Sequence, residues 1–152
     1  MQGYGRPSAY QVTQVSTTNK TKLVLMMYEG AIRFISDAKR CIETKDIAGR
    51  GIAINKAQRI IHELRAALNM EKGGEVAVNL EKVYTVVTKR LLNANITGSS
   101  AELAVCLDML SPLKEAWEQV SQKPGFEHML NSTAANAVAA AAGGSGGVKV
   151  AI

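Results

Sequence analysis

Residues 22–34 of the chain read Lys22-Leu23-Val24-Leu25-Met26-Met27-Tyr28-Glu29-Gly30-Ala31-Ile32-Arg33-Phe34. This segment is too apolar for an ordinary amphipathic helix, in which one stripe faces the core and the opposite face is polar. It is also too short and too charged to span a bilayer, which takes about 20 mostly apolar residues. We therefore expect a helix that buries one apolar face in the core of the protein and offers a second apolar face to another contact.

The composition of the whole chain favours a single helical domain. The chain has 152 residues, of which 47% are hydrophobic and 20% charged, which is enough apolar material for one core. Only 5% of the residues are aromatic and three are proline, and this favours a helical bundle over a β-sandwich or barrel. Because the breaks between the apolar segments are short, neighbouring helices should be antiparallel. The expected fold is an all-α, antiparallel four-helix bundle.

Cap and breaker residues divide this bundle into helices that are expected over residues 20–43, 47–68, 75–96 and 99–123. Asp46 offers an N-cap to the second helix, and Gly98 ends the third. Ser99 and Glu102 form a capping box, in which the hydroxyl and the carboxylate both satisfy backbone donors at the start of the fourth helix. Pro112 lacks an N–H group, which predicts a kink in that helix.

The two terminal segments differ in composition from the bundle at residues 20–123. Residues 1–19 are polar, with Gly and Pro early, and are expected to form a mobile N-terminal arm. Residues 124–152 are rich in Ala and Gly, which is typical of a flexible low-complexity tail. The longest uncharged stretch, residues 128–148, lies mostly in that tail and is too weakly hydrophobic to insert into a membrane. Without an apolar signal segment at the start, the protein is expected in the cytosol.

The sequence offers no candidate residues for catalysis, a metal or another cofactor. Neither His62 nor His128 has a Glu three residues earlier, as a di-metal carboxylate bundle requires. The glycine-rich stretches lack the Gly-Lys-Ser/Thr ending of a phosphate-binding loop, and no nucleophile motif is present. Cys41 and Cys106 have no metal-ligand spacing and are expected to be reduced, packed side chains. We therefore expect a binding protein rather than an enzyme.

Two other functions stay open as alternatives. A net charge of +5 is compatible with nucleic-acid binding, whose affinity would fall steeply as salt rises. However, Lys and Arg are spread along the chain and mostly alternate with Asp and Glu, so we expect no nucleic-acid partner. The second alternative is a homo-oligomeric structural bundle, such as a homodimer, that covers apolar stripes with its own copies.

Helical wheels separate a core stripe from apolar residues on other faces. In the first segment, Leu23, Met27 and Phe34 lie on the expected core stripe, whereas Leu25 and Ile32 extend the apolar arc beyond it. Isolated exposed apolar residues are common and often have no function. Here several helices share the surplus, which indicates a groove for an amphipathic helix of a partner. The second and third helices contribute Ile52, Val78, Leu92 and Ile96.

Several motifs, in this order, resemble those of the FliS family of flagellin export chaperones: Ala9-Tyr10-Gln11, residues 22–34, Lys56-Ala57-Gln58, Leu68 to Glu75, and Ala116-Trp117. The resemblance covers roughly residues 8–121. It implies a four-helix bundle that binds the carboxy-terminal region of flagellin in the bacterial cytosol and blocks its premature polymerisation. It also implies delivery to the flagellar type III export gate.

The same resemblance implies that the N-terminal segment lies over the groove and moves when flagellin binds. We expect this segment to act as a displaceable cover and the surplus apolar residues to contact flagellin. The predicted flagellin-binding residues are Tyr10, Val12 and Val15 in the cover, and Leu25, Ile32, Ile52, Val78, Leu92 and Ile96 in the groove.

Overall fold

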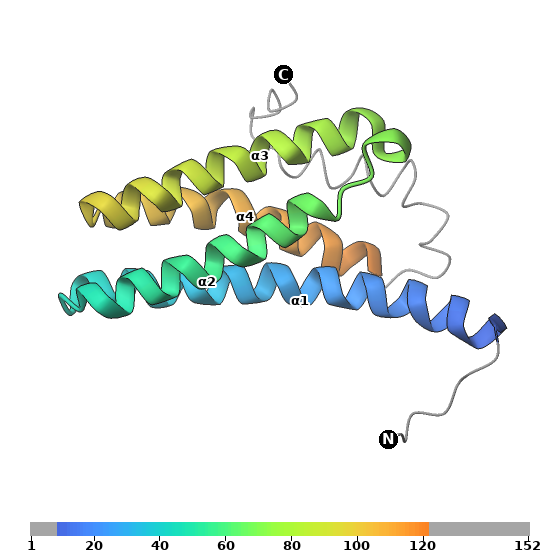
Figure 1. Cartoon of the computed structure of the whole chain (residues 1–152), viewed down its shortest axis with the longest axis horizontal. Helices are drawn as coiled ribbons and strands as arrows, with labels where there is room; N and C mark the ends of the chain where they lie inside the picture. Colours follow the sequence, from blue (N-terminus) through green and yellow to red (C-terminus); the bar gives the residue numbers. More distant parts are fainter. Residues whose placement is uncertain (1–8, 122–152) are drawn as a thin grey trace.

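A computed structural model describes residues 9–121 of the chain, with side chains for residues 20–120. Over this range the chain forms four helices and no strand, which confirms the all-α prediction (Figure 1). Helix α1 packs against α2 and α4, and α3 packs against the same two helices, so that α1 and α3 are diagonally opposite. The helices are α1 (Ala9–Glu43), α2 (Ile47–Ala66), α3 (Met70–Thr97) and α4 (Ser100–Ser121).

The first helix begins at Ala9, well ahead of the predicted start near Lys20. The polar residues 16–19 lie inside it. Hydroxyl and amide side chains are only mildly unfavourable in a helix interior, and no Gly or Pro lies between Ala9 and Gly30 to interrupt it. Mobility of residues 1–19 stays a prediction, because residues 1–8 lie outside the described part. The predicted tail at 124–152 lies outside it as well.

The start of α2 and the end of α3 follow the predicted caps. The side chain of Asp46 accepts a hydrogen bond of 2.9 Å from the backbone N–H of Gly49, which confirms it as the N-cap of α2. Gly98 adopts a left-handed conformation (φ 72°), and its N–H donates to the carbonyl of Ala94, as a helix C-cap requires. These contacts satisfy backbone groups that a helix leaves unpaired at its ends.

The start of α3 differs from the prediction. Asn69 caps a helical turn that begins at Met70, and its side chain accepts from the N–H of Lys72 at 2.9 Å. Gly74 then has a non-helical backbone (φ 51°, ψ −130°) that kinks the chain before the long part of α3. Only glycine adopts such a positive φ at little cost. The predicted start near Glu75 is therefore correct for the long part, whereas the preceding turn was missed.

The capping box at α4 is only half formed. The Ser99 hydroxyl accepts a long hydrogen bond of 3.4 Å from the N–H of Glu102. The Glu102 carboxylate instead accepts hydrogen bonds from Asn93 and Arg90 of α3, which lower its pKa. Glu102 thus ties α4 to α3 rather than capping its own helix. Helix α4 continues through Pro112 to Ser121, and the kink at this proline stays a prediction.

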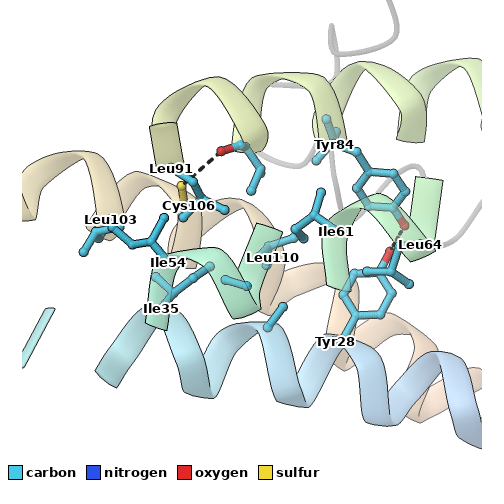
Figure 2. Packing of buried hydrophobic residues seen from close by; sticks show 14 of the residues in the cluster. Tyr28, Ile35, Ile54, Ile61, Leu64, Tyr84, Leu91, Leu103, Cys106 and Leu110 are labelled. Atoms are coloured by element: carbon cyan, nitrogen blue, oxygen red, sulfur yellow. Dashed lines mark hydrogen bonds between the residues drawn. The ribbon is translucent and has the colours of Figure 1, made fainter. Parts of the chain in front are cut away.

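The core lies between all four helices, and Figure 2 shows side chains from each of them meeting there. On α1 the core line runs through Tyr28, Ala31, Ile35 and Ala38, all fully buried. The prediction that Leu23 belongs to the core was wrong, because its side chain is 55% exposed. Leu23 is five positions before Tyr28, so its side chain points about 140° away from that of Tyr28 around the helix. The prediction had therefore centred the core stripe of α1 on a neighbouring line of residues rather than on the line through Tyr28 and Ile35.

Candidate partner-binding surface

Three large aliphatic side chains of α2 and α3 point into solvent. Their exposed fractions are 57% for Ile52, 53% for Leu92 and 71% for Ile96, whereas the neighbouring Leu91 is fully buried. All three were expected on the outside from their place on the helical wheel. An exposed aliphatic side chain is ordinary on its own, but a group of them on one face is typical of a binding surface.

Contacts between the helices bring these three residues to the same end of the bundle. The Arg50 side chain of α2 donates to the carbonyl oxygen of Asn95 in α3 at 2.9 Å. Ile52 follows Arg50 by two positions and Ile96 directly follows Asn95, so both lie at this level along the bundle axis. Leu92 precedes Ile96 by one helical turn. We refer to Ile52, Leu92 and Ile96 as the α2–α3 patch.

Val78, the remaining groove residue predicted on α3, is not part of this patch. It is 38% exposed and lies near the other end of α3. There Glu81 forms an ion pair of 3.6 Å with Arg65, close to the end of α2. Val78 therefore faces solvent as expected, but far along the helix from Leu92 and Ile96.

The two groove residues predicted on α1 are only half exposed. Leu25 is partly buried, and Ile32 packs against the hydrophobic core. Gly30 of α1 lies beside Ile60 of α2, which is eight positions beyond Ile52, so Leu25 and Ile32 lie further along the bundle than the α2–α3 patch. Their assignment to flagellin binding stays a prediction.

The predicted cover lies in the first turns of α1. The backbone of Tyr10, Val12 and Val15 is helical, while their side chains are outside the described set. Figure 1 shows these turns extending beyond the end of the bundle that is opposite the α2–α3 patch. In this structure the segment does not lie over the patch, and its role as a cover stays a prediction.

Sequence reasoning missed a polar hollow between α2 and α3. Its volume is about 560 Å³, and it is lined by α2 residues including Asn55, Arg59 and His62 and by Thr88 of α3. A signal was present in the sequence, because α2 carries four basic residues and one acidic residue. Two exposed side chains on α1 were also missed, Leu23 and Met26, the latter 62% exposed.

Two tyrosines and one cysteine are buried in the interior of the part that the structure describes. The hydroxyls of Tyr28 and Tyr84 are hydrogen-bonded to each other in the core. Burial raises the pKa of Tyr84 to about 12 and that of Tyr28 well above its ordinary value, so both stay neutral at physiological pH. Both Cys41 and Cys106 are free, and burial raises the pKa of the Cys106 thiol to about 12. These groups are packing elements rather than reactive ones.

The part of the chain that the structure describes contains neither a candidate metal site nor a candidate membrane-spanning helix. Residues 9–121 contain no cluster of three or more His, Cys, Asp or Glu side chains that could hold a metal ion. None of the four helices has a stretch long and apolar enough to cross a bilayer. The α2–α3 patch and the hollow beside it are therefore the features that a functional interpretation has to explain.

Comparison with known protein families shows to which family the chain belongs. The family model described as "Flagellar protein FliS" matches residues 3–124. The chain belongs to the FliS family. The resemblance drawn from the sequence motifs is confirmed, and the tail from residue 125 onward lies outside the matched range.

Individual relatives agree with this FliS assignment. The chain is 35% identical over 114 residues to the flagellar secretion chaperone FliS of Salmonella typhimurium, covering 74% of this chain and 84% of that protein. It is 34% identical to the flagellar secretion chaperone FliSB of Pseudomonas aeruginosa, covering 71% and 86%. The chaperone FliS of Bacillus subtilis is 33% identical, with coverage of 76% and 85%. This FliS chain is thus a member of a family of flagellar secretion chaperones.

Proposed function

We propose that this FliS chain binds the carboxy-terminal region of flagellin in the cytosol, prevents its premature polymerisation and hands it to the flagellar type III export apparatus. The observation that carries the proposal is the α2–α3 patch, which the fold itself does not use. Flagellin and the export gate component are the proposed partners. Holding a partner requires contact area rather than bond chemistry, so no catalytic residue is needed.

The geometry of the patch suits an amphipathic helix of the partner. Leu92 and Ile96 are four residues apart on one face of α3, and Ile52 is exposed at the same end of the bundle on α2, so a single partner segment at this end could contact all three. Such helix-in-groove recognition uses apolar anchors at spacings of three and four residues. Removing this surface from water contributes about 25 cal/mol per Å² of apolar area, before the costs of association.

The other predicted residues extend this proposal. Val78, Leu25 and Ile32 would provide further apolar contacts for a long partner segment that continues around the bundle. Tyr10, Val12 and Val15 would protect apolar surface until the partner arrives. These roles are secondary, because the α2–α3 patch supports the proposal without them.

The test is copurification of the chain with the carboxy-terminal segment of flagellin. Ile52→Asp and Leu92→Asp should abolish retention of flagellin while leaving the helical circular dichroism and thermal midpoint close to those of the wild type. Both side chains are more than half exposed, so a carboxylate is tolerated there. Retention of flagellin by both folded variants would contradict the proposal.

Leu25→Asp and Ile32→Asp test the second contact area, with a stricter control. Since these residues are half-buried, a loss of binding counts only if each variant keeps the thermal midpoint of the wild type. Folded variants that bind as tightly as the wild type would remove α1 from the proposed interface.

Two measurements separate the proposal from its alternatives. Light scattering over a concentration series detects a homodimer that covers the patch with a second copy. Titration with a DNA duplex at rising salt detects nucleic-acid binding, whose affinity would fall with a steep slope. We expect a chain that binds flagellin and no DNA.

A further inference from the structure

Helix α2 has the largest net positive charge of the four helices. This helix carries Arg50, Lys56, Arg59 and Arg65 against a single acid, Glu63, which is a net charge of +3 out of the +5 of the whole chain. An excess of positive charge of this kind attracts a partner surface of the opposite sign.

Three of the four cations already interact within the bundle. Arg50 donates to the carbonyl of Asn95, and Arg65 pairs with Glu81 of α3. Lys56 lies over the ring of Phe34 with its Nζ 5.4 Å from the ring centroid. Among the described residues, Arg59 has no such partner and is exposed.

Arg59 lies in the hollow between α2 and α3, which continues the α2–α3 patch along both helices. Asn55 follows Ile52 by three positions on α2, and Thr88 precedes Leu92 by four positions on α3, so these two hollow residues are each about one turn from a patch residue. A helix laid along the patch would therefore bring its next turn over Arg59.

We infer that this hollow receives an acidic side chain of the export substrate, so that the substrate helix carries aspartate or glutamate one to two turns from its apolar anchors. The inference rests on the proposed function, since it names the chemistry of the partner that the patch binds. The planar guanidinium of Arg59 offers two parallel donors to a carboxylate. The polar side chains of Asn55 and His62, in the same hollow, offer further hydrogen bonds.

Glu63 lines the same hollow and carries the charge opposite to that of Arg59, so substitutions of the two residues should change affinity in opposite directions. An acidic side chain of the partner would be repelled by Glu63 and attracted by Arg59. Glu63→Gln should therefore strengthen binding, whereas Arg59→Glu should weaken it. A hollow that merely excludes water would not respond in opposite directions to these two changes.

The experiment is calorimetric titration of the full chain with the carboxy-terminal segment of flagellin at 50 and 500 mM NaCl. We expect Arg59→Glu to weaken binding about tenfold at low salt, Glu63→Gln to strengthen it about twofold to threefold, and both effects to shrink at high salt. Lys45→Glu, which makes the same change of charge in the exposed connection between α1 and α2, is the matched control and should change affinity less than twofold.

The outcomes distinguish this inference from the proposed function. If Leu92→Asp abolishes binding while Arg59→Glu and Lys45→Glu bind alike, the proposed function stands and the acidic-partner inference is wrong. If the wild type does not bind the segment at all, both fail. If a DNA duplex binds with the same dependence on Arg59, the anion is a phosphate backbone, and the inference is overturned.

Discussion

The side chains of Tyr28 in α1 and Tyr84 in α3 are hydrogen-bonded through their hydroxyl groups, although 56 positions separate them in the chain. Their rings are tilted by 47° with centroids 6.5 Å apart, inside the core shown in Figure 2. Because α1 and α3 are diagonal in the bundle, this bond joins two helices that are not neighbours. A buried polar pair of this kind fixes how the two helices align along the bundle axis.

Removing both hydroxyls should destabilise the fold by less than the sum of the two single removals. Tyr28→Phe leaves the Tyr84 hydroxyl buried without its partner, at a cost of about 1–3 kcal/mol, and Tyr84→Phe has the converse effect. The double variant loses donor and acceptor together and should cost clearly less than the sum. Urea unfolding of the four proteins gives the coupling energy. Strictly additive effects would mean that the hydroxyls contribute independently.

Stability should fall at alkaline pH because three buried groups stay protonated in the fold. Ordinary pKa values are 10.0 for Tyr and 9.0 for Cys, whereas burial raises those of Tyr84 and Cys106 to about 12 and that of Tyr28 well above its ordinary value. Between pH 9 and 12 the unfolded chain therefore releases protons that the folded chain keeps. These groups leave the free energy of unfolding unchanged below about pH 8, and it decreases as the pH rises through 9 and 10, by up to about 1.4 kcal/mol per pH unit for each group.

The double variant Tyr28→Phe with Tyr84→Phe checks this assignment. It removes two of the three titrating groups, so its free energy of unfolding should decline less steeply between pH 9 and 11.5 than that of the wild type. Equal slopes in urea unfolding series would show that other groups cause the alkaline loss.

Two glycines, Gly51 and Gly98, lie where Arg50 of α2 contacts Asn95 of α3, and replacing them with alanine should change the stability in opposite directions. At Gly98, with φ 72°, an added Cβ would meet the Arg50 side chain at 2.8 Å, so Gly98→Ala should cost about 1–3 kcal/mol. At Gly51, inside α2, the nearest atom would lie 3.7 Å away, so Gly51→Ala should stabilise by about 0.5–1 kcal/mol. Thermal unfolding should give a lower midpoint for Gly98→Ala and a higher midpoint for Gly51→Ala than for the wild type. Equal changes of the midpoint in the two variants would contradict these backbone conformations.

The sequence predicted most helix ends because local side chains determine them. Asp46 and Gly98 act within their own turns, so their roles are readable from residue type and position. The capping role of Glu102 was wrong in part because its carboxylate binds Arg90 and Asn93, contacts that exist only once α3 and α4 are packed. Tertiary partners of this kind leave no local pattern.

The surface was harder to predict than the helices. Leu92 and Ile96 were correctly predicted to be exposed because the apolar residues of α3 form one clear core stripe, and these two residues lie outside it. On α1 two apolar arcs adjoin, and only packing against both α2 and α4 decided that Tyr28 and Ile35 face the core while Leu23 does not. The hollow at Arg59 depends on how two helices lie side by side, which the sequence of either helix does not contain.

The most direct test of flagellin binding at the α2–α3 patch compares two aspartates on the same helix. Leu92 lies in the patch, whereas Val86, 38% exposed, lies about 120° away around α3. Calorimetric titration with the carboxy-terminal segment of flagellin should show Leu92→Asp binding at least about tenfold more weakly than the wild type, with Val86→Asp unchanged. Wild-type affinity in a folded Leu92→Asp variant, or a greater loss in Val86→Asp, would contradict the location of the binding surface.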